Sequence, residues 1–141
     1  ASYEHSPQKE IGVFPILLTQ EGIQDNKIAH FGDSLQVGHW HNDMPGLTHA
    51  SKILASSAGC PRQIVRYTDL VYGFQCHMEF TPAVVSLLID SEKDLSLQSQ
   101  RHQFVQSADE IKDYDYHEMN DKLYKFLDLL ASTYLKTLAK K

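Results

Sequence analysis

The spacing of hydrophobic residues changes near Thr81 and divides the chain into two parts. Before Thr81, short runs of β-branched and aromatic residues alternate with turn-forming residues, a pattern typical of strands. After it, apolar residues recur every three or four positions, as on one face of a helix. We therefore predict one domain over residues 1–141, with strands and loops in 1–80 and helices in 81–141.

Four or five strands are predicted in the first part. The first covers Lys9–Thr19, and Pro15 inside it lacks an N–H, which places it at a sheet edge or a bulge. The second is Ser34–His41, after which Asn-Asp-Met-Pro-Gly is expected to break the chain. The others are predicted at residues 51–58, Gln63–Tyr67 and Leu70–His77, and the last two would form a hairpin about Tyr-Thr-Asp.

About three helices are predicted in the second part. Thr81 and Pro82 are typical of a helix start, since proline lacks the N–H that would be unpaired there. Residues 91–101 are polar, which predicts a loop or a mobile helix, while Ser107 with Glu110 forms a capping-box pattern. Asp115 and Glu118 predict a similar start for the last helix. Its apolar stripe is expected to pack in the core and consists of Met119, Leu123, Phe126, Leu127, Leu130, Tyr134, Leu135 and Leu138.

Composition excludes several classes of protein. The net charge of -5 and the pI near 5.9 argue against a nucleic-acid partner, which would require a basic face. No run of 18 apolar residues is present, so no membrane partner is predicted, and the polar start does not resemble a secretory signal. Two cysteines are too few for a disulfide scaffold, which favours a cytoplasmic protein.

The most informative residues are His77 and Glu79, at the end of an apolar run. Residues i and i+2 of an extended chain share a face, so the two side chains should point the same way. A carboxylate beside an imidazole orients the ring and stabilises its protonated form, as a general base serving a nucleophile requires. No glycine-rich phosphate loop is visible, and no cofactor is predicted.

Four segments in order extend this pattern to a family. They are KEIGVFPILLTQEG, VGHWHNDMP, LASSAGCPRQIVRY and GFQCHMEFTP. Together they closely resemble the C-terminal part of class I glutamine amidotransferase domains, particularly freestanding relatives of the amidotransferase domain of GMP synthase. Met78 stands where many members have proline, and Asn42 stands where the family usually has glycine.

The resemblance implies an α/β, flavodoxin-like fold for the whole family domain, and an α+β appearance for this part of it. It also implies hydrolysis of L-glutamine by a Cys-His-Glu triad, in which His77 and Glu79 are the last two members. Trp40, His41 and Asn42 would lie on the loop near the α-carboxylate and α-amino groups of glutamine. The ammonia would pass to a synthetase partner.

The sequence departs from the family at the nucleophile. The family's cysteine lies in a Gly-x-Cys-x-Gly elbow upstream of these segments, and the 141 residues contain no such motif. Cys60 and Cys76 are expected to be small packed side chains. We therefore expect a C-terminal part that is inactive alone, with the nucleophile half supplied by a separate chain, or its exposed surface covered by another copy.

Two other interpretations remain open. His39, His41, Asp43, His77 and Glu79 could form a mixed nitrogen and oxygen metal site in a β-rich module. Alternatively, the chain is a non-catalytic pseudo-enzyme domain that serves in binding or assembly. Tyr114 and Tyr116, in an acidic segment, would then form a contact surface, or else simply a solvated helix entry.

Overall fold

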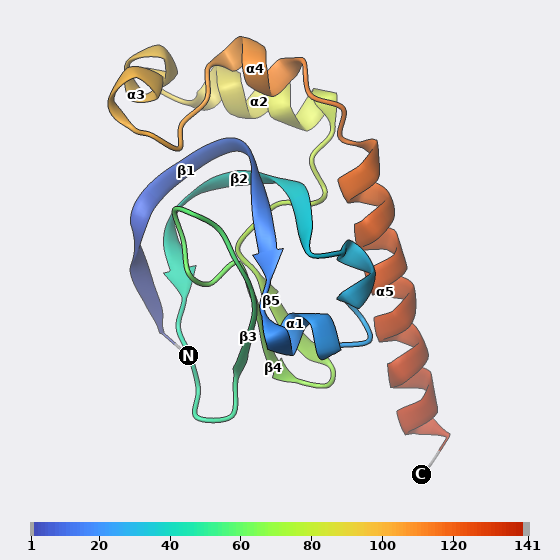
Figure 1. The fold of residues 1–141 in the computed structure, drawn as a ribbon. Coiled ribbons are helices and arrows are strands. Elements are labelled where there is room, and N and C mark those ends of the chain that lie inside the picture. Colours follow the sequence, from blue (N-terminus) through green and yellow to red (C-terminus); the bar gives the residue numbers. More distant parts are fainter. Residues whose placement is uncertain (1, 140–141) are drawn as a thin grey trace.

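The computed structural model describes residues 2–139 and consists of one curled antiparallel sheet with helices around it (Figure 1). The five strands lie in the order β2-β1-β3-β4-β5. Their bounds are β1 (Tyr3–Leu18), β2 (Ser34–Pro45), β3 (Lys52–Ser56), β4 (Ile64–Thr68) and β5 (Val71–Phe74). The helices are α1 (Gln20–Gln24), the 3₁₀ helix η1 (Ala29–Phe31), α2 (Pro82–Ser91), α3 (Leu95–Arg101), α4 (Ala108–Lys112) and α5 (His117–Leu138).

The sheet curls until the chain beyond β5 meets β2 again. Gly38 in β2 and His77 form an isolated antiparallel bridge, with the two N–H to O distances at 2.7 and 3.0 Å. The predicted hairpin of β4 and β5 is confirmed by their antiparallel pairing. Every pairing between the five strands is antiparallel, and the parallel bridge of Ile11 with Val105 is an isolated one, so the parallel part of a flavodoxin-like sheet is not formed within residues 2–139.

Pro15 lies neither on an edge strand nor at a bulge. Strand β1 is internal to the sheet order, and its register shift against β2 lies between His5 and Glu10. Pairing of β1 with β3 involves only Leu17 and Leu18, so β1 pairs with β2 alone at Pro15. A missing N–H is tolerated there because one side of the strand needs no donor.

Strand β2 is longer than predicted. It continues through Asn42 to Pro45 instead of ending at His41, because residues 3–5 of β1 pair with residues 43–45. Long-range pairing therefore overrides the local Asn-Asp-Met-Pro-Gly signal.

Local capping signals placed α2 and α4 correctly. The Thr81 hydroxyl accepts from the Val84 N–H at 3.3 Å, and Ser107 with Glu110 forms the predicted capping box. Of the two alternatives predicted for residues 91–101, the helix is confirmed for most of the segment, since Leu95 is buried and begins a regular helix, α3. As a result, four α-helices follow β5 within residues 2–139 instead of about three.

The predicted start of α5 is confirmed to within one residue, although Asp115 and Glu118 form no capping box. Asp115 accepts from the His117 N–H at 3.0 Å, and the helix begins at His117. Because the Asp115 carboxylate bonds to His117, it does not form a capping box with Glu118.

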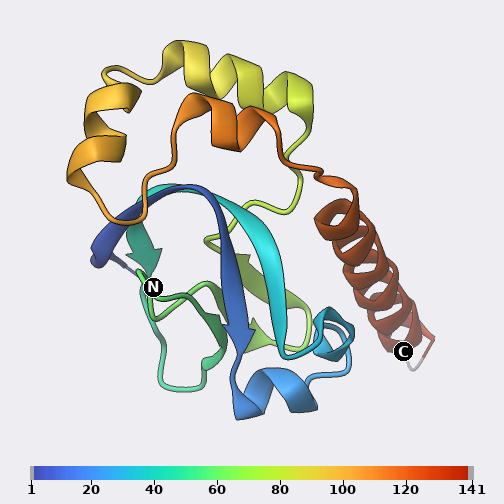
Figure 2. The same cartoon turned by 45° about the horizontal axis from the view of Figure 1, so that its top comes forward.

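The stripe on α5 is only partly in the core. Met119 and Phe126 are buried, and Leu123 and Leu130 pack against them. Beyond these the helix runs past the sheet, as Figures 1 and 2 show. The prediction of core packing is therefore wrong for Leu127 and for the outer residues of the stripe, and these side chains are 45–62% exposed: Leu127, Tyr134, Leu135 and Leu138.

The core fills the curled sheet and its contacts with α2, α4 and α5. Its fully buried side chains include Ile11, Ile16, Ile28, Val37, Leu54, Ile64, Val85 and Ile111. None of the helices in residues 2–139 combines the length and the apolar character that crossing a membrane requires.

Candidate functional site

His77 and Glu79 are in direct contact, as the sequence predicted. The distance between His77 Nδ1 and Glu79 Oε1 is 2.6 Å. Because a carboxylate only accepts, Nδ1 carries the donated proton and Nε2 is left for another partner. Burial raises the pKa of Glu79, but hydrogen bonding to His77 and to nearby main-chain groups outweighs it, and the pKa is lowered overall. Glu79 is therefore a carboxylate at neutral pH.

The imidazole of His77 is held by the core as well as by Glu79. Its ring stacks on Phe80 with centroids 4.9 Å apart and planes at 6°. Phe80 is buried, and its ring also meets Tyr116 edge-on at 6.2 Å. The bridge to Gly38 fixes the main chain of His77, and a Cβ on Gly38 would lie 2.3 Å from the Phe80 ring. Only glycine therefore fits at position 38, where the strand passes this ring.

Trp40, His41 and Asn42 lie on strand β2, so the prediction of a loop is wrong. Because side chains alternate along a strand, Trp40 and Asn42 point to one face and His41 to the other. The Trp40 ring lies edge-on to the Phe80 ring with centroids 6.5 Å apart, and its Nε1 donates to Glu92 at 3.0 Å. Asn42 is exposed. Trp40 therefore lies one aromatic ring away from His77, whereas His41 belongs to a different cluster.

That second cluster is a buried polar network around Glu10. His41 Nε2 lies 3.0 Å from Glu10 Oε2, and His39 Nδ1 lies 3.5 Å from the same oxygen. Ser57 and Gln63 donate to the two carboxylate oxygens at 2.7 and 2.6 Å. Burial raises the pKa of Glu10, but the histidines and Ser57 outweigh it and lower the pKa overall.

Sequence reasoning missed Glu10. The signal that could have found it is the register of the first two strands, which pairs Glu10 with His41.

Burial lowers the pKa of His39 to about 4, against the opposing charge of Glu10. His39 is therefore neutral at pH 7.

The five residues considered for a metal site are divided among separate contacts. Asp43 lies 2.7 Å from His5, and His77 is bound to Glu79, while His39 and His41 face Glu10. A different group, Glu10, His41 and Cys60, has its ligand atoms within 4.8 Å of one another. Both Glu10 oxygens already accept protein hydrogen bonds, so this group is satisfied without an ion.

Neither cysteine resembles a nucleophile. Cys60 and Cys76 are both buried. Burial raises the pKa of each thiol, which opposes the thiolate that nucleophilic attack requires. The prediction that both are packed side chains agrees with this burial.

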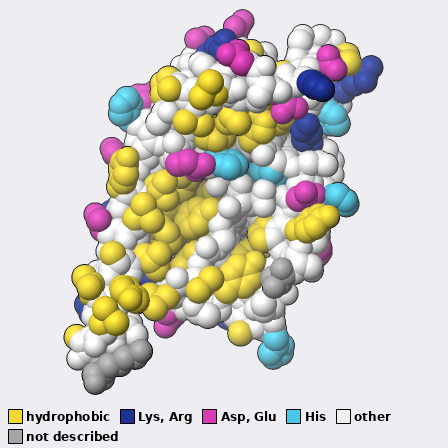
Figure 3. Space-filling view, turned by 180° about the vertical axis from the view of Figure 1, so that it is seen from behind, with side chains coloured by type: hydrophobic (Ala, Val, Ile, Leu, Met, Phe, Trp, Pro, Cys, Tyr) yellow, Lys and Arg dark blue, Asp and Glu magenta, His cyan; other side chains and the backbone are white. Residues whose placement is uncertain are grey.

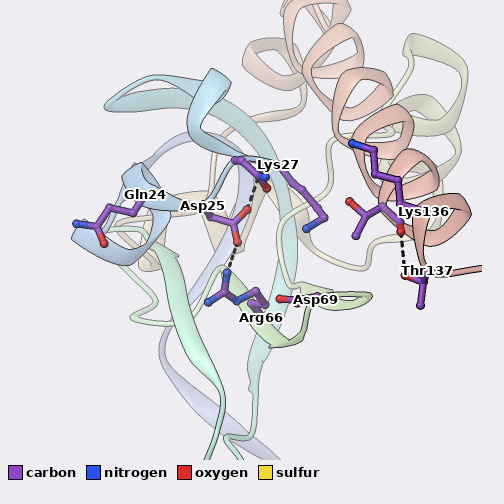
Figure 4. Close-up of a pocket in the computed structure, with 9 residues that line it drawn as sticks. Gln24, Asp25, Lys27, Arg66, Asp69, Lys136 and Thr137 are labelled. Atoms are coloured by element: carbon purple, nitrogen blue, oxygen red, sulfur yellow. Dashed lines mark hydrogen bonds and ion pairs between the residues drawn. The ribbon is translucent and has the colours of Figure 1, made fainter. Parts of the chain in front are cut away.

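A polar hollow on the surface lies away from His77. It has a volume of about 640 Å³ and lies between the α1 region, the β4–β5 turn and α5 (Figure 4). Arg66 donates to Asp25 at 2.8 Å on one wall. Because its polar lining carries opposite charges that partly neutralise each other and contains no part of the His77 pair, we do not assign it to the candidate site.

Tyr116 does not belong to a contact surface or a solvated helix entry. It is 3% exposed, and its hydroxyl donates to the Ile111 carbonyl at 2.7 Å. Burial, and then the neighbouring Tyr114, raise the pKa of Tyr116 to about 12. Tyr116 therefore serves the core beneath Phe80.

No family model matches the chain. The chain is 54% identical over 126 residues to YfeJ of Salmonella typhimurium, named as glutamine amidotransferase-like, and the match covers 89% of this chain and 53% of YfeJ. The relatives of this chain are glutamine amidotransferase-like proteins. The chain spans about half the length of the curated relative that it matches.

Solved structures agree with this match. SMU.1228c is 52% identical with a TM-score of 0.91, covering 93% of this chain and 56% of that one. A glutamine amidotransferase from Methylobacillus flagellatus is 22% identical with a TM-score of 0.78, covering 93% and 55%. A GMP synthase-type protein from Thermoplasma acidophilum is 19% identical with a TM-score of 0.59, covering 100% and 53%. The last two show the shared fold, and the predicted α/β fold class is confirmed.

Proposed function

We propose that this chain provides the histidine and the carboxylate of a glutamine amidotransferase that hydrolyses L-glutamine to glutamate and ammonia. The observation that carries the proposal is the 2.6 Å contact of His77 Nδ1 with Glu79, which leaves Nε2 for a nucleophile. The similarity to YfeJ and SMU.1228c along most of the chain supports it.

The proposed chemistry begins with a cysteine thiolate outside these 141 residues. Its sulfur attacks the side-chain amide carbon of glutamine, and His77 Nε2, having taken the thiol proton, gives a proton to the departing ammonia. Water then attacks the glutamyl thioester with His77 as the base, which releases glutamate and restores the thiol. Glu79 keeps the ring oriented and stabilises its charged form throughout.

The nucleophile half is proposed to be supplied by another part of the protein. The buried state of Cys60 and Cys76 favours this arrangement, as does the coverage of about half of each relative. Hydrophobic side chains also gather on the back face and continue to the C-terminal end of α5 (Figure 3). Such a face is suited to packing against a further layer of structure.

Trp40 is the proposed substrate residue best placed for this chemistry. Its ring meets the Phe80 ring edge-on with centroids 6.5 Å apart, and His77 stacks on the same Phe80 ring. Asn42 points to the same face of β2, and His41 would act only through its main chain. The motifs shared with the GMP synthase amidotransferase domain favour a synthetase as the acceptor of ammonia.

A complementation assay tests the proposal. The chain is combined with the upstream half of YfeJ, and glutamate release from L-glutamine is measured beside each part alone. We expect activity only in the combination, with His77→Ala lowering the rate by about 10³-fold. Glu79→Gln should lower the rate less than His77→Ala, because the imidazole that transfers the protons is still present.

His117→Ala is the matched control. His117 and Asp115 form a pair with the same spacing and the same 2.6 Å contact, but both side chains are fully solvated. Removing His117 should leave the rate unchanged. If the combined halves associate but release no glutamate, the non-catalytic binding interpretation replaces the enzyme. If the activity needs added divalent metal, the metal interpretation moves ahead.

A further inference from the structure

The main chain around Glu79 is held from outside by Asn120 on α5. Its side-chain Nδ2 donates to the Met78 carbonyl at 2.6 Å and to the Phe80 carbonyl at 3.0 Å. These two carbonyls bracket Glu79. Because an amide nitrogen carries two hydrogens, one side chain satisfies both acceptors and fixes the direction of the segment.

The hydrogen bonds from Asn120 are needed because the side chain of Glu79 is not enclosed by other residues. More than half of its side-chain surface is exposed, and it borders a hollow of about 120 Å³ lined by Thr81, Asn120, Leu123 and Tyr124. A carboxylate with this much room can turn away from its partner. The position of its main chain therefore decides whether the contact with His77 persists.

We propose that Asn120 is a positioning residue for the His77–Glu79 pair, which it acts on by clamping the carbonyls on both sides of Glu79. This inference rests on the proposed function for its catalytic meaning. His77 is fixed from the other side by its bridge to Gly38 and its stack on Phe80. Strand β2 thus positions the base and helix α5 positions the carboxylate.

The test uses the chain as it is, with ¹⁵N-labelled histidine and ¹³C-labelled glutamate. A hydrogen bond to a carboxylate moves an imidazole Nδ1 proton downfield and slows its exchange with water, so this resonance reports the contact directly. The carboxyl carbon of Glu79, followed against pH, reports whether its pKa stays lowered. The exposed His117–Asp115 pair provides an internal reference in the same sample.

Asn120→Ala removes the clamp, and Asn120→Asp keeps the shape but replaces the donor with an acceptor. We expect both to lose the downfield His77 proton and to raise the titration midpoint of Glu79 towards the ordinary value of about 4.3. Lys122→Ala is the matched control, since it removes a 2.6 Å bond from the same helix to the His30 carbonyl. It should leave both signals in place.

An unchanged His77 proton and Glu79 midpoint in the folded Asn120 variants would overturn the proposal. So would unfolding of both variants under conditions where Lys122→Ala stays folded, because Asn120 would then be a folding residue. In the complemented protein, Asn120→Ala should lower kcat with little change in KM. If the complemented native protein proves inactive, the proposed function fails, while the resonance experiment still decides the role of Asn120.

Discussion

Gly38 and His77 exchange two main-chain hydrogen bonds although they lie far apart in the sequence. The exchange closes the curled sheet at one point and fixes where the candidate base stands. The ring of Phe80 lies directly beside this bridge and stacks under the imidazole. The fold and the candidate site therefore depend on the same small contact.

Gly38→Ala should destabilise the protein by about 2 kcal/mol, because the new Cβ would lie 2.3 Å from the Phe80 ring and 2.7 Å from the His77 carbonyl. Unfolding in guanidinium measures the change. Gly73→Ala is the control, since its Cβ would meet only the edge of Tyr67 at 3.2 Å. Equal effects of the two substitutions would show that the crowding at Gly38 is relieved by movement of Phe80.

Glu10→Ala should cost roughly 3–5 kcal/mol, because it leaves the histidines, Ser57 and Gln63 around a buried site without their acceptor. Glu10→Gln should cost less, since an amide oxygen still accepts. Glu21→Ala is the comparison: its 2.7 Å pair with Lys52 is exposed and should contribute less than about 1 kcal/mol. Thermal and denaturant unfolding give both values, and a small effect at Glu10 would mean that the network is hydrated.

Stability should fall as the pH drops from about 6.5 to about 4. The folded pKa of His39 is about 4 because the ring is buried, whereas the unfolded chain binds this proton near 6.5. The unfolded state therefore carries more protons over this range, and acidification favours it by roughly 3 kcal/mol.

His39→Gln should flatten this pH dependence when the free energy of unfolding is measured at several pH values. Exposed His49→Gln should follow the native profile. A native profile that stays level between pH 6.5 and 4 would contradict the neutral state of buried His39.

Predictions that rest on neighbouring residues were the most accurate. Thr81, Ser107 and Glu110 cap helices through contacts within one turn, so their roles can be read from the sequence. The His77–Glu79 contact is similarly local, because an extended chain places alternate residues on one face.

Features set by distant partners could not be predicted. The buried role of Glu10 depends on its register opposite His41, and a glutamate in a strand otherwise suggests a surface residue. Strand β2 likewise extends past its turn residues because β1 pairs with it. The partly exposed stripe on α5 has the periodicity of a buried one, and the sequence does not reveal what lies opposite it.

The outer part of α5 provides the sharpest test of that stripe. Leu135 is 62% exposed, so Leu135→Glu should change the free energy of unfolding by less than about 0.5 kcal/mol. Phe126 is buried against Tyr72 and Phe74, with ring centroids 5.2 and 4.9 Å away, and Phe126→Ala should cost roughly 3–5 kcal/mol. In the complementation assay, by contrast, Leu135→Glu should raise the concentration of the upstream half needed for activity. If Leu135→Glu instead unfolds the isolated chain as Phe126→Ala does, the outer turns of α5 belong to its own core.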